Sequence, residues 1–271
     1  MPLKKYPYYL SSISNLLTRF ENPVLISRYF TGINRPTEPS QVKLRSGQRF
    51  IVRNAMDIWS IKETFVDRFY ERFGTPIQDD WVVMDVGAGL GDYTVFAAEH
   101  SPSIRVFAYE PFEESFALLG DNLRLNGIEN AQVFNTAVGG RSGLMRLDLT
   151  GGEPLQIQSA DLIHNNEEDF ADSIVVPSLS LGDALSSNSL GKCDLLKLDC
   201  EGAEYAILFE AGEDILQKVE RIVMEYHDGI TNFTHKDMAE FLGQNGYTAI
   251  ITPNYVHDNI GYLYAERKTP N

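Results

Sequence analysis

The chain has 271 residues and a formal net charge of −15, from 23 Lys and Arg against 38 Asp and Glu. Its basic residues form no cluster, which argues against a nucleic-acid partner, because such binding neutralises phosphates with Lys and Arg. Two cysteines are too few for a disulfide scaffold, and no apolar run has the length of a signal peptide core or a membrane span, so we expect a cytoplasmic protein.

Residues 1–78 are predicted to form an extension of short helices and one hairpin. In chain order, the predicted elements are helices over 13–20 and 25–30, hairpin strands over 42–45 and 49–53, and a helix over 57–73. Ser46-Gly47 supplies the turn of the hairpin, and Gly74-Thr75-Pro76 ends the last helix.

Residues 79–271 are predicted to form one α/β domain in which strands and helices alternate. The predicted strands are 81–86, 105–109, 132–135, 144–149, 194–198, 221–225, 247–251 and 262–267. The predicted helices are 92–100, one with Pro111 in its first turn and Gly127 past its end, 201–217 and 234–245. This alternation indicates a mostly parallel, doubly wound sheet. The last two strands have no helix between them, so they should pair antiparallel.

A long segment, 150–177, interrupts the alternation. It contains Gly151-Gly152 and an acidic run over 165–169. Long loops in compact domains are usually functional or disordered. Two interpretations therefore stay open, a mobile lid over an acceptor and a solvated insertion.

A glycine-rich turn after the first strand of the domain is the strongest motif of the chain. Gly87, Gly89 and Gly91 lie between an apolar strand and an amphipathic helix. Glu110 follows about 20 positions later, at the tip of the next strand, where a carboxylate accepts hydrogen bonds from ribose hydroxyls. Asp92 stands where a dinucleotide fingerprint has its third glycine, and its charge would repel a pyrophosphate. The pattern therefore favours S-adenosylmethionine over NAD, with a purely structural turn as the alternative.

Acidic residues follow two later strands, where open α/β sheets bind their ligands. For Asp199, at a strand tip, we favour contact with a ligand, whereas helix capping is the slightly better explanation for Glu201 and Glu204. Glu225 and His227 project to the same side of an extended chain. His227 is either structural or catalytic. These residues show no diagnostic spacing for a metal, so we expect none.

Six blocks of the chain together resemble the FkbM family of S-adenosylmethionine-dependent methyltransferases. They are Asp-Val-Gly-Ala-Gly-Leu-Gly-Asp-Tyr-Thr at 85–94, Ala-Tyr-Glu-Pro-Phe at 108–112, Asn-Leu-Arg-Leu-Asn at 122–126, Thr-Ala-Val-Gly at 136–139, Leu-Leu-Lys-Leu-Asp-Cys-Glu-Gly-Ala-Glu at 195–204 and Val-Met-Glu-Tyr-His at 223–227. The block at 195–204 is the most specific, although the family usually has a small aliphatic residue in place of Cys200. The resemblance does not reach residues 1–40.

The resemblance implies a class I methyltransferase (Rossmann-like) fold, a doubly wound seven-stranded sheet with an antiparallel last strand. It implies O-methylation of a hydroxyl on a sugar, a polyketide or another natural-product or glycan acceptor. N-methylation of an amide or amine of a peptide or small molecule, and a non-catalytic scaffold with the same fold, are the alternatives. The general base is expected to be His227 or Asp199, with Glu225 orienting the histidine.

The resemblance also assigns residues to S-adenosylmethionine. The expected contacts are Asp85, Gly87, Ala88, Gly89, Gly91, Tyr93, Thr94, Glu110, Phe112, Thr136, Ala137 and Asp199. Phe112 is expected near the adenine, with Thr136 and Ala137 on the other side of the base. Asp199 is expected beside the transferred methyl group.

Overall fold

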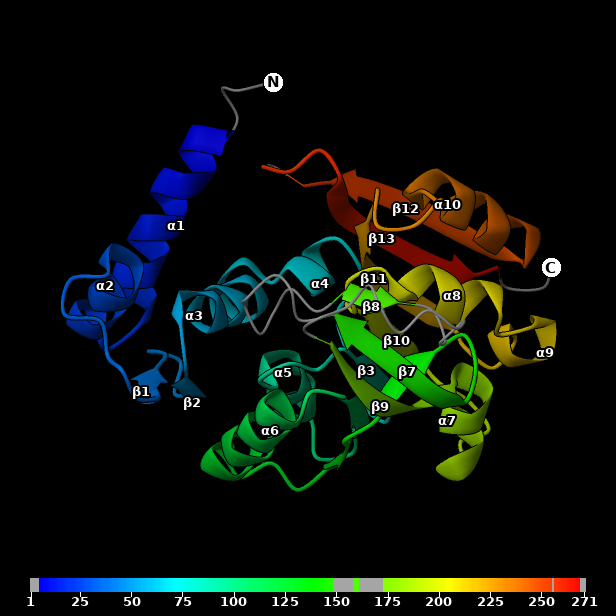
Figure 1. Cartoon of the computed structure of the whole chain (residues 1–271), viewed down its shortest axis with the longest axis horizontal. Helices are drawn as coiled ribbons and strands as arrows, with labels where there is room; N and C mark the ends of the chain where they lie inside the picture. The colour runs from blue at the N-terminus through cyan, green and yellow to red at the C-terminus, as the bar shows by residue number, and fades with distance from the viewer. Residues whose placement is uncertain (1–4, 149–157, 161–172, 255, 269–271) are drawn as a thin grey trace.

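The computed structural model of the chain describes residues 5–148, 158–160, 173–254 and 256–268. Its centre is a seven-stranded sheet (Figure 1). In spatial order the strands are β12 (Tyr247–Pro253), β13 (Ile260–Arg267), β11 (Arg221–His227), β10 (Leu195–Leu198), β3 (Val82–Val86), β4 (Arg105–Tyr109) and β5 (Ala131–Phe134). All neighbours pair parallel except the last strand, β13, which runs antiparallel to both β11 and β12. The predicted sheet and its antiparallel last strand are confirmed.

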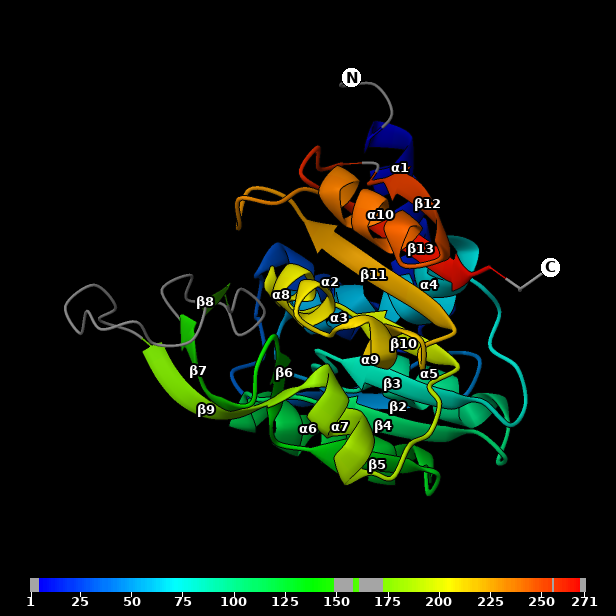
Figure 2. The same cartoon turned by 90° about the vertical axis from the view of Figure 1, so that its right-hand side faces the viewer.

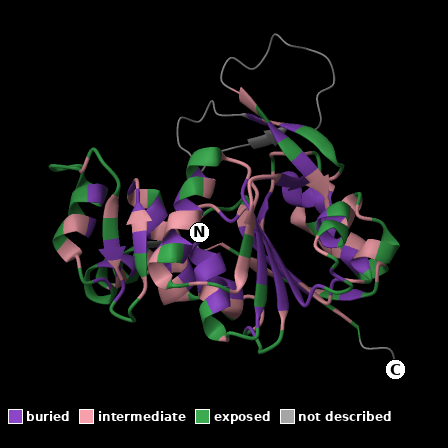
Figure 3. Ribbon diagram, turned by 90° about the horizontal axis from the view of Figure 1, so that it is seen from below, coloured by how far each residue is buried: buried purple, intermediate pink, exposed green. Residues whose placement is uncertain are grey.

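Helices cover both faces of this sheet (Figure 2). One face carries α5 (Asp92–His100) and α6 (Glu113–Asn126), and the other carries α7 (Leu181–Ser187), α8 (Ala203–Phe209), α9 (Glu213–Leu216) and α10 (His235–Gln244). Successive strand residues point to opposite faces, so Met84 and Leu196 join one core while Val83 and Leu195 join the other. Both faces are therefore buried, as Figure 3 shows, which explains the nearly continuous apolar runs of the strands.

The N-terminal extension packs beside α6. It contains α1 (Lys5–Arg19), α2 (Pro23–Thr31), the hairpin β1 (Ser40–Lys43) with β2 (Arg49–Val52), and α3 (Ala55–Lys62). Phe50 and Ile61 of the extension share one apolar core with Leu119 of α6. The Ile51 amide also donates a 2.7 Å hydrogen bond to the Asn122 side chain. The extension is therefore joined to the sheet by a common core, while the boundary between residues 78 and 79 stays a prediction.

Two predicted helices are interrupted. The helix predicted over 57–73 consists of α3, a π-helical turn η1 (Glu63–Asp67) and α4 (Phe69–Arg72), and Arg68 between them has a left-handed φ of 53°. A π turn aligns residues five apart, and Lys62 forms an ion pair with Asp67 across it. The helix predicted over 201–217 is divided into α8 and α9, with Gly212 at a φ of 76° between them.

A second sheet was not predicted, and the strand predicted over 144–149 belongs to it rather than to the central sheet. Its strands, in the order β6-β9-β7-β8, are β6 (Ala137–Gly139), β9 (Ser173–Ser180), β7 (Gly143–Asp148) and β8 (Gln158–Ala160). The predicted acceptor lid over 150–177 lies mostly outside the described residues. Its last part, 173–177, belongs to β9 and is a paired strand rather than a loop. Among the described residues, no helix combines the length and the apolar character that a membrane crossing requires.

Candidate active site

A cavity of about 320 Å³ lies at the carboxyl ends of the central strands. Its walls include Gly87 after β3, Glu110 after β4, Asp199 after β10 and His227 at the end of β11. Trp59 of α3 closes another side. Ligands of open α/β sheets bind at this edge, and the volume is that of a small-molecule pocket.

The three glycines of the turn have different structural roles. Gly87 has a φ of 76°, and a Cβ atom there would collide with the Asp199 carbonyl oxygen, so Gly87 allows the turns after β3 and β10 to touch. Gly91 immediately precedes α5, and a Cβ atom there would collide with Leu119. Gly89 has a φ of 55°, and nothing lies within 4 Å of its hypothetical Cβ atom. Of the three, Gly87 and Gly89 line the cavity, and Gly91 does not.

Glu110 lines the cavity with a side chain held by backbone amides. Its Oε2 accepts a 2.8 Å hydrogen bond from the Gly89 amide, and its Oε1 accepts a 2.9 Å bond from the Phe112 amide. Burial raises the pKa of Glu110 to about 7. Because each carboxylate oxygen has two lone pairs, two acceptor positions remain for hydroxyl groups.

A buried ion pair supports the floor of the site. Lys197 Nζ lies 3.1 Å from Asp85 Oδ1 and donates a 2.9 Å hydrogen bond to the Gly87 carbonyl. The Thr94 hydroxyl donates a 2.6 Å bond to Asp85. Burial opposes the charge of Lys197, but Asp85 and Asp199 outweigh it and raise the pKa of Lys197. Asp85 and Thr94 therefore lie beneath the cavity, outside its lining.

The other predicted cofactor residues fall into two groups. Ala88, Tyr93, Ala137 and Asp199 line the cavity, whereas Phe112 and Thr136 are not among its lining residues. Tyr70, which the sequence reasoning missed, donates a 2.7 Å hydrogen bond from its hydroxyl to Asp199 Oδ2. Tyr70 and Asp199 are 129 positions apart. No local pattern predicts such a contact.

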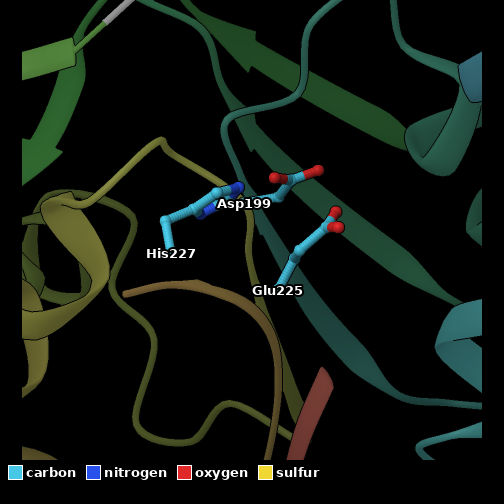
Figure 4. Close-up of side chains that lie close together, drawn as sticks. All are labelled: Asp199, Glu225 and His227. Atoms are coloured by element: carbon cyan, nitrogen blue, oxygen red, sulfur yellow. The ribbon is translucent and has the colours of Figure 1, made fainter. Parts of the chain in front are cut away.

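Asp199, Glu225 and His227 come together in the cavity (Figure 4). The prediction that Glu225 and His227 share one side of β11 is confirmed by their common place in the lining. The carboxylates in contact with the imidazole are different ones: Nδ1 lies 3.3 Å from Glu204 Oε1, and Nε2 lies 3.6 Å from Glu201 Oε2. Glu225 makes no hydrogen bond with any described residue.

Glu204 is itself fixed in place. It accepts 2.7 Å hydrogen bonds from the amides of Cys200 and Gly202, which explains a fully buried carboxylate at the start of α8. Burial opposes the charge of His227, but the carboxylates of Glu204, Glu201 and Glu225 outweigh it and raise the pKa of His227 to about 10. Glu204 therefore combines the predicted capping with a contact to the histidine.

The cavity carries an excess of acidic side chains. Burial raises the pKa of Glu63 and of Glu201 to about 7 each, and that of Glu225 well above its usual range. Lys197 and His227, whose pKa values are raised, oppose these carboxylates, and His257 is a third basic side chain of the lining. Such a site favours a cationic ligand, because a positive charge relieves the mutual repulsion of the carboxylates.

Asp92 joins the glycine-turn side of the cavity to the extension. The hydroxyl of Ser60 donates a 3.1 Å hydrogen bond to Asp92 Oδ2, and the hydroxyl of Thr64 donates to the same oxygen. Asp92 is buried, which raises its pKa. Asp92, which stands where a dinucleotide fingerprint has a glycine, is thus hydrogen-bonded to one residue of α3 and one of η1.

The sequence and the fold were compared with those of known proteins. The pattern of the Methyltransferase FkbM domain matches residues 85–249. The chain is 27% identical over 192 residues to the 31-O-demethyl-FK506 methyltransferase FkbM of Streptomyces tacrolimicus, covering 62% of this chain and 73% of that protein. It is 27% identical over 245 residues to the AMB antimetabolite synthetase AmbE of Pseudomonas aeruginosa, covering 78% of this chain but only 12% of the synthetase.

A solved S-adenosylmethionine-dependent methyltransferase from Agrobacterium tumefaciens shares the fold. The TM-score is 0.51 at 10% identity, over 88% of this chain and 72% of that one. This likeness concerns the fold alone. The domain match, which extends over more than half of the residues, shows that the chain belongs to the FkbM family of S-adenosylmethionine-dependent methyltransferases.

Proposed function

We propose that the chain transfers the methyl group of S-adenosylmethionine to a hydroxyl oxygen of a sugar, a polyketide or another natural-product acceptor. One arrangement supports the proposal. Glu110, a carboxylate placed to accept ribose hydroxyls, lies after β4 and lines the same cavity as a second group of side chains at the ends of β10 and β11. These are Asp199, Glu225 and His227. A hydroxyl acceptor is also in keeping with the name of the Streptomyces relative, which specifies a 31-O position.

The cofactor is proposed to lie over the glycine turn. The free lone pairs of Glu110 would accept the ribose hydroxyls, and the open space at Gly89 would admit the methionine part. Gly91, Asp85 and Thr94 would act from below by fixing the turn. Phe112, Thr136 and Ala137 are proposed at the adenine, where Ala137 is a lining residue.

The reaction needs an in-line arrangement and a base. The acceptor oxygen approaches the methyl carbon to about 3 Å on the side opposite the sulfur. The new oxygen–carbon bond forms as the carbon–sulfur bond breaks, and the hydroxyl proton passes to a group within hydrogen-bond reach. Asp199 or His227 would take this proton. His227 holds its own proton at neutral pH in the ligand-free protein, so it would first have to release it.

The acceptor side is proposed to involve the extension. Trp59 and Glu63 line the cavity from α3 and η1, and Met145 and Leu147 line it from β7. This mixture of aromatic, acidic and aliphatic side chains suits an acceptor with both apolar and hydroxyl-bearing parts. We propose residues 1–78 as the extension that shapes this wall and 79–271 as the methyltransferase domain.

Ligand binding and product analysis test the proposal. Calorimetry should show binding of S-adenosylhomocysteine and no response to NAD. Incubation of S-adenosylmethionine carrying a labelled methyl group with a panel of hydroxylated acceptors should give a product labelled on oxygen, as located by mass spectrometry. The variant Asp199→Asn should lose turnover, whereas Glu210→Gln, outside the cavity lining, should keep it.

Three results would contradict the proposal in different ways. Binding of NAD without S-adenosylhomocysteine would contradict the cofactor. Label on nitrogen would replace the hydroxyl by an amide or amine acceptor. Cofactor binding without turnover across the acceptors of related chemistry would favour a non-catalytic scaffold.

A further inference from the structure

Three side chains from two neighbouring strands converge on one point of the cavity. Asp199 follows β10, and Glu225 and His227 belong to β11. One ligand atom of each lies within 4.8 Å of those of the other two. Figure 4 shows the imidazole and both carboxylates turned toward one another. The sequence alone gave no metal-type spacing, because the set is assembled across the sheet.

The histidine of this cluster is a buried group that lacks a hydrogen bond. His227 is 5% exposed, and its Nδ1 makes no hydrogen bond with the described residues. That atom faces Glu204 at 3.3 Å, so Nε2 is the nitrogen left for a ligand on the side of Asp199 and Glu225 (Figure 4). Nε2 also lies 3.6 Å from Glu201 Oε2, which is beyond hydrogen-bond distance. Metal-binding histidines commonly have this arrangement, in which a carboxylate holds one ring nitrogen and a metal holds the other.

Glu225 also lacks a hydrogen bond with the described residues. It is a partly buried carboxylate without a hydrogen-bond donor among the described residues, beside a second carboxylate, Asp199. Buried charged groups ordinarily have a partner or a coordinated ion. Lys197 lies 3.8 Å from Asp199 but is already bound to Asp85 and the Gly87 carbonyl. Among the described residues, the imidazole of His227 therefore balances the two carboxylates, and a metal ion bound here would take the place of its proton.

We infer that Asp199, Glu225 and His227 bind one divalent cation, Mg²⁺ or Mn²⁺. Two carboxylates and one imidazole are a mixed oxygen and nitrogen set, and carboxylate oxygens favour these hard ions. Three protein ligands leave coordination positions open for water or for oxygen atoms of the acceptor. The substrate class that fits is an acceptor with two neighbouring oxygen atoms, such as a vicinal diol, able to chelate the ion.

This inference deepens the proposed function and depends on it for the role of the cation. A hydroxyl bound to a divalent cation is more acidic, so it loses its proton more readily as the methyl group is transferred. His227, as a ligand, would then not serve as the base. The proton would pass to the carboxylate oxygen of Asp199 that does not bind the ion.

Titration with Mn²⁺, followed by electron paramagnetic resonance, tests the site on the whole chain. The wild-type protein with bound S-adenosylhomocysteine should bind one Mn²⁺ per chain, and Mg²⁺ should displace it. Glu225→Gln and His227→Asn should each weaken Mn²⁺ binding by about tenfold or more, because each removes a ligand. Circular dichroism of each variant checks the fold.

Glu110→Gln is the matched control, because Glu110 is a buried carboxylate of the same cavity outside the cluster. This variant should bind S-adenosylhomocysteine more weakly and Mn²⁺ as tightly as the wild type, and Glu225→Gln should show the reverse. Failure of the wild type to bind one Mn²⁺ per chain, or unchanged Mn²⁺ affinity in folded Glu225→Gln, would overturn the inference. Failure to bind S-adenosylhomocysteine would instead overturn the proposed function.

Discussion

The substitution Gly89→Ala, compared with Gly127→Ala, distinguishes an effect on ligand affinity from an effect on stability. The backbone there has a φ of 55°, and that of Gly127, past the end of α6, has a φ of 68°. Alanine in this left-handed region costs about 1 kcal/mol at either position. Neither hypothetical Cβ atom meets anything within 4 Å, so packing adds nothing in the ligand-free protein. Gly89→Ala and Gly127→Ala should therefore each lower the melting temperature by about 2–4 °C.

The two variants should differ when the cofactor binds. Gly89 lines the cavity and Gly127 does not. A methyl group forced against a well-packed ligand costs about 1–3 kcal/mol, which corresponds to about a 5- to 150-fold loss of affinity. Calorimetric titration with S-adenosylhomocysteine should show this loss for Gly89→Ala and wild-type affinity for Gly127→Ala.

The comparison can refute the placement of the cofactor. If Gly89→Ala binds S-adenosylhomocysteine within about twofold of the wild type, the ligand does not pass over this glycine. If both variants lose affinity equally, the cause is the backbone strain that they share rather than contact with the ligand.

Three further changes test the floor, the base region and the ribose contact. Asp85→Asn should lower the free energy of unfolding by about 3–5 kcal/mol in a denaturant titration, because it leaves the buried charge of Lys197 without its main partner; a loss below about 1 kcal/mol would contradict this. Tyr70→Phe keeps the ring but removes the 2.7 Å hydrogen bond to Asp199, so kcat should fall while S-adenosylhomocysteine affinity holds; an unchanged kcat would separate Tyr70 from the reaction. The pKa of Glu110 is about 7 in the ligand-free protein, and ribose hydroxyls that donate to its carboxylate favour the ionised form, so ligand binding should lower this pKa. Affinity for S-adenosylhomocysteine should then rise from about pH 5 to about pH 7 and level off above, and Glu110→Gln should flatten the profile; a falling affinity would refute the contact.

The central sheet could be predicted because its determinants are local. Strands buried on both faces appear as apolar runs, and the helix ends at Gly127 and Thr234 have their own signals. The helix interruption at Arg68 has no such signal. The π turn before it contacts α1, where the Tyr8 hydroxyl donates a 3.1 Å hydrogen bond to Glu63, and a contact between distant parts of the chain is not visible in the local sequence. The second sheet was missed although Val176 and Ser178 of β9 alternate with exposed residues, since the acidic run before them suggested a loop.

The residues of the candidate site also fall into those with a local sequence signal and those without one. The glycine turn, Glu110 and the Asp199–His227 region follow strands directly, so their positions could be predicted from the alternation. Tyr70 could not, because it reaches Asp199 only through the packing of α4 on the sheet. The contact of Glu204 with His227 was not predicted, because helix capping alone was a sufficient explanation for this carboxylate. The structure shows the two backbone hydrogen bonds of that capping together with the contact to the histidine.

The link between Asp92 and the hydroxyls of Ser60 and Thr64 has a thermodynamic consequence. It ties the first turn of α5, which begins beside the glycine turn, to the helix that carries Trp59. A displacement of either half of the cavity on ligand binding would be transmitted to the other half through these hydrogen bonds. Coupling of this kind is reciprocal. If a bound acceptor raises the affinity for the cofactor by some factor, the bound cofactor raises the affinity for the acceptor by the same factor.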